Sequence, residues 1–367
     1  MPLSFPELAI RRVLIAVAGL VLAIACGNSG HAAPRKAGKP ANKAPASRSK
    51  AATDVRLVRV PQGGLQPQVA VDSEGTVHLV YLADDPQSAN VFYVQKARSE
   101  DANIEAFSKP LHVNSQPGSA IAIGSIRGAQ LALGKANRVH VAWNGSGKAE
   151  PKGQVKYGNP MLYSRLADDG AGFEPQRNVI HEAYGLDGGG SVAADRQGNV
   201  YVTWHAGSNE ASRRVWVARS DDDGATFKSE IEADSGEDGA CGCCGMKAMA
   251  DDRGTLFMLY RSAREKVNRD MLLLTSNDRG KTFRRELAGN WIVDVCPMSS
   301  EAFVETPESV LAAWETDGQA FFSRIDKKDR QLSKPIAAPG SADGRKHPAL
   351  AANSRGETIL VWTEGTG

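Results

Sequence analysis

The sequence predicts an all-β protein, a six-bladed β-propeller whose last blade is incomplete. Two observations lead to this prediction. One strand–turn–strand phrase recurs along the chain, and a second turn phrase falls between its copies at similar spacing. A fixed period of this length is typical of propellers, in which each repeat forms one four-stranded blade. The predicted propeller covers residues 54–367.

The first copies of the repeat follow a segment typical of an export signal. Arg11 and Arg12 precede an uncharged apolar run over residues 13–25, which is too short to cross a bilayer. We therefore expect a signal peptide over residues 1–33. Cys26 ends the run in the context LAIAC, which resembles a bacterial lipobox, so cleavage before Cys26 and lipid attachment there is the alternative. The expected location is the periplasm, the cell envelope or the medium, with membrane contact only through that anchor.

A basic linker is expected next. Residues 34–53 are rich in Ala, Lys, Pro and Ser and lack apolar periodicity, so they cannot bury enough surface to order themselves. The remainder holds 36 of the 44 basic and 41 of the 42 acidic residues. The predicted propeller is therefore mildly acidic and offers no basic patch for nucleic acid.

The repeated phrase predicts two strands and a tight turn in each blade. It reads VDSEGTVHLVYL from Val71, ADRQGNVYVTWH from Ala194, ADDRGTLFMLYR from Ala250 and ANSRGETILVWT from Ala352. The glycine suits a turn position that needs positive φ, and the second strand ends in an aromatic residue. With two looser copies, these aromatics recur every 48 to 62 residues, at Tyr81, Trp143, Trp204, Tyr260, Trp314 and Trp362.

The predicted sixth blade is short of strands. Only five residues follow Trp362, so this blade has its first two strands and no third. Residues 54–60 match the fourth-strand phrases of other blades, and we expect them to close the ring. An unpaired strand at this place would favour association with other chains.

The second phrase is a turn that appears intact twice, as SDDDGATF over residues 220–227 and SNDRGKTF over residues 276–283. It resembles the Asp-box, Ser-x-Asp-x-Gly-x-Thr-Phe, of sialidases and other bacterial BNR-repeat propellers. The aspartate of such a turn accepts backbone N–H bonds and the glycine takes the left-handed position. The resemblance implies a sialidase-like propeller, in which Asp222 and Asp278 are scaffold residues rather than catalytic ones.

Four cysteines fall at matching positions in the sequence repeats of two neighbouring blades. Three lie in the phrase ACGCCG over residues 240–245 and the fourth in NWIVDVCP over residues 290–297. In an oxidising compartment a disulfide is the first expectation, with Cys296 joined to Cys241, Cys243 or Cys244. A thiolate site for copper or zinc at these four cysteines is the alternative, and a redox pair is the third. No other cofactor is expected.

The stretch from Cys241 to Pro297 is similar to an uncharacterised CxCC-containing group of sialidase-like proteins. The resemblance implies a ligand-binding face that takes a glycan or an envelope protein. Its expected lining is Arg261, Arg269, Asp270, Trp291 and Asp294. A salt bridge between hairpins explains Arg269 and Asp270 equally well.

An active exo-sialidase is the alternative function, and a metal-handling or redox accessory protein is the third. Sialidases bind the substrate carboxylate with three arginines and use an Asp acid/base and a Tyr–Glu pair. Arg59 stands in VRVP, which resembles the F/Y-R-I-P motif of that family, and Asp84 or Asp85 follows the first hairpin. The other members of the set have no candidates, so the sequence leaves the question of catalysis open.

Overall fold

The computed structural model describes residues 57–98 and 107–365, apart from residues 123, 125, 127, 153–157, 237, 266 and 341–343. The chain separates into two units, Met1–Leu57 and Val58–Gly367. The expected signal peptide, the linker and Cys26 lie outside the described residues. No helix in the described part is long and apolar enough to cross a membrane.

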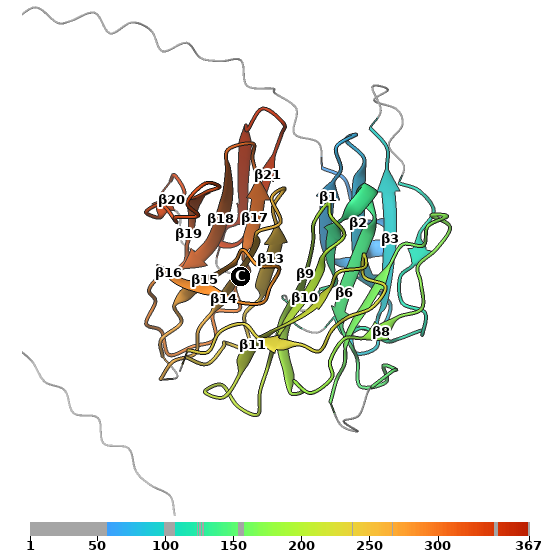
Figure 1. Cartoon of the computed structure of the whole chain (residues 1–367), viewed down its shortest axis with the longest axis horizontal. Helices are drawn as coiled ribbons and strands as arrows, with labels where there is room; N and C mark the ends of the chain where they lie inside the picture. Colours follow the sequence, from blue (N-terminus) through green and yellow to red (C-terminus); the bar gives the residue numbers. More distant parts are fainter. Residues whose placement is uncertain are drawn as a thin grey trace, which may run out of the picture. The chain divides into compact units, whose positions relative to one another are not determined.

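The second unit is built from β-strands, as the sequence predicts. Four-stranded antiparallel sheets follow one another along the chain, each in simple sequence order. Figure 1 shows their inner strands side by side. The sheets comprise β1 (Leu65–Val71), β2 (Val77–Ala83), β3 (Asn90–Lys96) and β4 (Leu111–His112); β5 (Gln130–Leu133), β6 (Val139–Asn144), β7 (Met161–Arg165) and β8 (Arg177–Asn178); β9 (Leu186–Ala194), β10 (Val200–Ala206), β11 (Arg214–Ser220) and β12 (Ile231–Glu232); β13 (Met246–Ala250), β14 (Leu256–Arg261), β15 (Met271–Ser276) and β16 (Arg284–Gly289); and β17 (Ala302–Glu305), β18 (Ser309–Thr316), β19 (Gln319–Asp326) and β20 (Ile336–Ala337).

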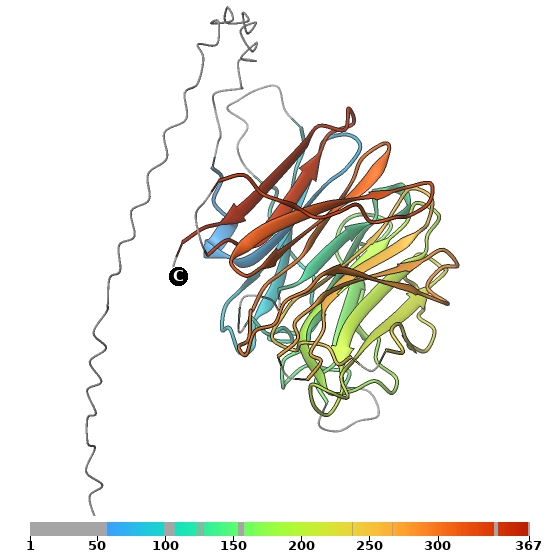
Figure 2. The ribbon, with the colours of Figure 1, turned by 90° about the vertical axis from the view of Figure 1, so that its left-hand side faces the viewer.

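The expectation of six blades is wrong, because the described residues form five. The sixth sheet has only two strands, β21 (Lys346–Ala352) and β22 (Thr358–Thr363). The described part of the predicted closing strand, residues 57–60, is not a strand but leads into a 3₁₀ turn, η1 (Pro61–Gly63). Proline at the start of this turn has no N–H to donate to a ladder, which disfavours strand pairing there. Figure 2 shows the last two strands in red.

The core lies between neighbouring sheets. Each large cluster of buried side chains joins two consecutive blades, so every blade packs on the next one. The predicted closing aromatics supply much of this packing, since Tyr81, Trp143, Trp204, Tyr260 and Trp314 are all buried. Fully burying a side chain of this size contributes about 2 to 3 kcal/mol. The recurring aromatic position is therefore a scaffold feature.

The two ends of the unit are much less buried than its middle. In β10 and β14 every residue is buried, whereas β1 and β22 alternate between exposed and half-buried residues. Val71 is 59% exposed and Ile359 is 65% exposed. The incomplete sheet therefore leaves apolar strand faces open to solvent.

Candidate functional site

The first strands of all six sheets surround a central channel of about 690 Å³. These strands contact one another in the order β1, β5, β9, β13, β17 and β21. The strands begin at one mouth of the channel, where polar side chains gather, including Gln68, Gln130, Lys247 and Glu301. The other end is lined mainly by aliphatic residues of the same strands.

Lys247 is the cation of this channel. It stands in the middle of the apolar sequence of β13, and its ammonium lies 3.0 Å from Oε1 of Gln130 and 3.4 Å from Oε1 of Gln68. Within the described ranges no carboxylate forms an ion pair with it. Burial lowers the pKa of Lys247 to about 8, although Glu301 partly opposes this shift. The side chain therefore stays largely protonated at neutral pH without a bonded counter-ion.

Glu301 is the acidic side chain at the same mouth of the channel. It is 6% exposed, and neither carboxylate oxygen has a hydrogen-bond partner among the described residues. Burial, followed by the charge of Cys244, raises the pKa of Glu301 well above its usual range. Burial without partners therefore favours the protonated form of Glu301, in which the carboxyl group is a hydrogen-bond donor. Among the described residues Lys247 thus has no bonded counter-ion in the channel mouth, although the charge of Glu301, when ionised, favours the protonated form of Lys247.

The second candidate site is the loop that enters the channel wall just before β13. Cys241 Sγ lies 3.2 Å from Cys243 Sγ and 3.3 Å from Cys244 Sγ. The hydrogen-bonded contacts of Cys241 with Cys243 and Cys244 lower the pKa of Cys241. The next residue, Gly245, lines the channel and donates to Ser299 O at 2.9 Å. The loop that carries the three thiols therefore leads directly into the channel wall at Gly245, two residues before Lys247.

The predicted disulfide is not present. All four cysteines in the described residues are free, and Cys296 is exposed. The sulfur separations within the loop exceed the roughly 2.05 Å of a disulfide bond by more than 1 Å. Cys241, Cys243 and Cys244 form a compact cluster without Cys296.

Four of the five residues predicted to line a ligand face do lie together, but mostly below the surface. Arg261, Arg269 and Asp270 are buried. Arg261 donates to Arg269 O at 2.6 Å and its guanidinium lies 4.9 Å from the ring centre of Trp291. The amide of Trp291 donates to Asp270 at 2.9 Å. This arrangement makes them a support for the cysteine loop, whose Cys241 amide donates to Arg261 O at 2.9 Å. Asp294 is exposed and outside this cluster.

The weak catalytic candidates lie on exposed turns. Arg59 precedes η1, and Asp84 and Asp85 follow β2. Asp84 accepts a hydrogen bond from Asn90 at 2.6 Å, and Asp85 accepts one from the amide of Gln87 at 3.0 Å. These bonds explain the two aspartates as turn residues.

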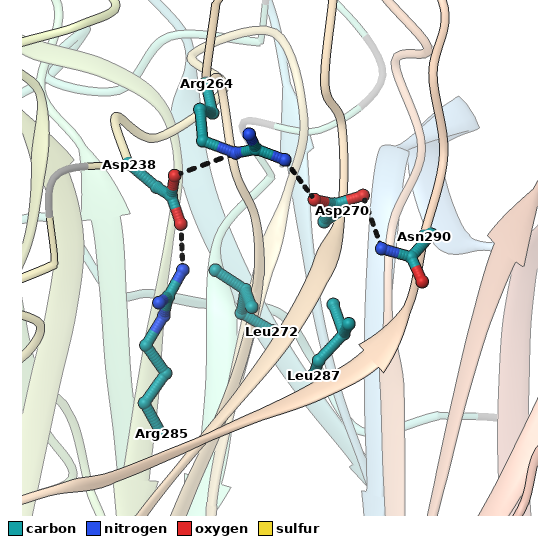
Figure 3. A pocket seen from close by; sticks show the side chains of 7 residues that line it. All are labelled: Asp238, Arg264, Asp270, Leu272, Arg285, Leu287 and Asn290. Carbon is teal, nitrogen blue, oxygen red and sulfur yellow. Dashed lines mark hydrogen bonds and ion pairs between the residues drawn. The ribbon is translucent and has the colours of Figure 1, made fainter.

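A surface pocket of about 330 Å³ lies beside β15 and β16, and Figure 3 shows its lining. Arg264 lies 3.1 Å from Asp238 and 3.6 Å from Asp270, while Arg285 pairs with Asp238 and lies 3.3 Å from Asp234. The charges of this pocket are thus paired with one another. It offers a ligand less uncompensated charge than the channel mouth does.

Sequence reasoning missed Lys247 and Glu301. A signal for Lys247 was present, because it interrupts the apolar sequence MKAMA of an inner strand. Glu301 gave no such signal, since it precedes β17 and its burial depends on contacts with other blades. Its position shows only in the structure.

The comparisons with known proteins concern the fold. No protein-family model matches the sequence, and no curated protein matches it. Several solved structures do. A leech intramolecular trans-sialidase complexed with 2,7-anhydro-Neu5Ac has a TM-score of 0.53 at 13% identity, with 82% of this chain and 65% of that chain covered. An intramolecular trans-sialidase from Ruminococcus gnavus has a TM-score of 0.53 at 12% identity, with 81% and 89% covered.

The NanB sialidase from Streptococcus pneumoniae has a TM-score of 0.51 at 10% identity, with 82% of this chain and 65% of that chain covered. The chain therefore spans about two thirds of the length of two of these three structures. At such identities the likeness shows the fold alone. The fold neighbours are sialidases, and this chain has a sialidase-like propeller arrangement.

Proposed function

We propose that this protein is a sialidase-like propeller of the Asp-box type that binds a small acidic sugar at the channel mouth. The observation that carries the proposal is Lys247, a cation inside the channel with amide oxygens but no carboxylate at bonding distance in the described residues. An anionic group would supply the missing counter-charge. The CxCC loop leads into the channel wall at the same end, so the proposed ligand lies next to the segment from Cys241 to Pro297.

The rest of the mouth suits a hydroxylated ligand. Glu301 can donate to a ligand oxygen when it is protonated, and the carboxamides of Gln68 and Gln130 offer both donors and acceptors. A cavity of about 690 Å³ is within the usual size range for small-molecule sites. Fold neighbours with sialic acid derivatives or a carboxylate inhibitor in their names agree with an acidic sugar as the class of ligand.

We propose binding rather than hydrolysis, and we place the protein outside the cytoplasm, in line with the N-terminal sequence. A single ammonium replaces the planar arginine forks that sialidases use for the substrate carboxylate. Arg261, Arg269 and Arg345 are buried in contacts with the protein itself. A lysine can bind an anion by ion pairing alone, without the bidentate contacts that the arginines of sialidases make with the substrate carboxylate.

Calorimetric titration of the full chain tests this proposal. N-acetylneuraminic acid, 2,7-anhydro-Neu5Ac and glucuronic acid are compared with the neutral sugar N-acetylglucosamine. Lys247→Met should weaken binding of the acidic sugars about 10- to 100-fold, the loss expected for a charged hydrogen bond. Lys135→Met, on the exposed 3₁₀ turn η2 (Lys135–Asn137), is the matched control and should bind like the wild type.

Two outcomes would overturn the proposal. Equal affinity for the neutral sugar, or full affinity in Lys247→Met, would remove Lys247 as the anion site. Hydrolysis of a fluorogenic sialoside at a rate above that of the buffer would show an enzyme instead of a binding protein.

A further inference from the structure

The cysteine loop is built as a fixed group of three sulfurs. The Sγ atoms of Cys241, Cys243 and Cys244 all lie within 4.8 Å of one another. Cys241 and Cys244 are fully buried, whereas Cys243 is partly exposed and gives access from solvent. Three sulfurs facing one another across a short loop are a ready set of ligands for one ion.

Backbone contacts hold this loop in place before any ligand arrives. The Cys241 amide donates to Arg261 O at 2.9 Å, and the Cys244 amide donates to Cys241 O at 3.3 Å. Gly242 lies between them in a crowded place, because a Cβ there would come within 2.5 Å of the Asp187 carboxylate and would force that side chain to move. The positions of the three sulfurs therefore depend on Arg261 of β14, on Asp187 of β9 and on the hydrogen bond within the loop itself.

The surroundings of the loop contain buried polar atoms that lack partners. In the described part of the chain these are Nε of Arg213, Nε of Arg261, and both Nε and Nη1 of Arg269. Buried N–H groups are rarely left unbonded, and each such case calls for an explanation. Arg213 Nη1 donates to Ala240 O at 3.0 Å, so its guanidinium adjoins the loop. Arg213 is paired with Asp187 at 2.9 Å and Arg269 with Glu210 at 3.2 Å, so these guanidinium groups offer the loop unbonded N–H donors rather than free charges.

No other ligand completes the set. Among the described residues, the only group of three or more His, Cys, Asp or Glu side chains close enough to share an ion consists of these three cysteines. Zn²⁺ in protein sites is almost always four-coordinate, and its structural sites use four protein ligands. Cu(I) is a soft ion that prefers sulfur and is stable with three thiolates. A buried set of three thiolates therefore suits Cu(I) better than Zn²⁺.

We propose that Cys241, Cys243 and Cys244 bind one Cu(I) ion as three thiolates. On binding, each cysteine that still carries a proton releases it to solvent, and each of the three thiolate sulfurs forms a bond to copper with no change in oxidation state. The complex carries two negative charges, toward which the unbonded N–H groups of Arg213, Arg261 and Arg269 can donate hydrogen bonds. Cys296 is not a ligand in this proposal.

Anaerobic titration of the reduced full chain with Cu(I), in competition with the chelator bicinchoninate, tests the proposal. The wild type should retain one copper per chain. Cys241→Ser, Cys243→Ser and Cys244→Ser should each lose at least about 100-fold in affinity, since each removes one of three metal–sulfur bonds. The matched control is the double variant Cys26→Ser/Cys296→Ser, which removes the other two cysteines and should bind as the wild type does.

A second measurement covers variants that fold poorly. Bound copper should protect Cys241, Cys243 and Cys244 of the wild type from alkylation, as read by mass spectrometry, and leave Cys296 reactive. Loss of copper in the double variant, tighter retention of Zn²⁺ than of Cu(I), or a disulfide within the loop that persists under mild reduction would each overturn the proposal. This site does not include Lys247, so its failure and that of sugar binding are separable.

Discussion

Two kinds of loop in this propeller differ in how their polar groups are satisfied. In the SxDxGxTF turns at residues 220–227 and 276–283, the aspartate accepts bonds from within its own turn. Asp222 takes the Ser220 hydroxyl at 2.6 Å and the Thr226 amide at 2.9 Å, and Asp278 takes the Ser276 hydroxyl at 2.8 Å and the Thr282 amide at 2.9 Å.

The cysteine loop is the opposite case. Its thiols contact one another, and the buried arginines around it keep N–H groups without partners among the described residues. A loop that bonds itself needs nothing more from outside, whereas a loop surrounded by unbonded donors is complete only with a ligand. The difference separates scaffold from site more clearly than the sequence motifs do.

The largest expected effect is stabilisation by copper. A ligand that binds only the folded state at a free concentration about 1,000 times its Kd adds about 4 kcal/mol to the free energy of unfolding. We expect the melting temperature to rise by several degrees with Cu(I), as followed by circular dichroism. The rise should vanish in Cys244→Ser and persist in Asp278→Ala. A rise that survives in Cys244→Ser would show that copper acts elsewhere.

The next effect concerns the scaffold turn. Asp278→Ala removes an acceptor for two amides and two hydroxyls, so we expect a loss of about 1 to 3 kcal/mol in urea unfolding. Affinities for Cu(I) and for acidic sugars should not change. Glu308→Ala, at an exposed turn between β17 and β18, is the control and should lose less. Weaker copper binding in Asp278→Ala would contradict the separation of scaffold from site.

The smallest effect is a pH dependence at the channel mouth. Because burial raises the pKa of Glu301, the folded state holds a proton that the unfolded state releases near pH 4.5, and stability falls as pH rises above that value. Glu301→Gln cannot ionise, so it should match the wild type below about pH 4.5 and become progressively more stable than the wild type as pH rises above that value. Urea unfolding at several pH values measures this. Exposed Glu308→Gln should follow the wild-type curve, and a parallel curve for Glu301→Gln would refute the burial argument.

The sequence predicts the blades well because their signals are local. The glycine turns, the aromatic residue that ends each second strand and the SxDxGxTF turns all depend on residues a few positions apart. Tyr81 and Trp204, for example, are buried as expected. The blade number was wrong because closure depends on pairing between distant segments, and residues 57–60 do not provide it.

The candidate site was predicted only in part, for the same reason. The proximity of Cys241, Cys243 and Cys244 follows from their spacing, whereas Cys296, predicted at a matching position of the next blade, is not part of their cluster. Whether a side chain at that level turns inward is decided by packing, and Cys296 is exposed. The unbonded N–H groups of the buried arginines and the position of Lys247 in the channel depend on contacts between blades, and no short sequence motif predicts such contacts.

X-ray absorption at the copper edge on the Cu(I)-loaded protein tests the central claim most directly. The account predicts copper bonded to three sulfurs, with no nitrogen or oxygen at bonding distance, and loss of this signal in Cys241→Ser. A shell with fewer sulfurs, a mixed shell with nitrogen, or an unchanged spectrum in Cys241→Ser would contradict it.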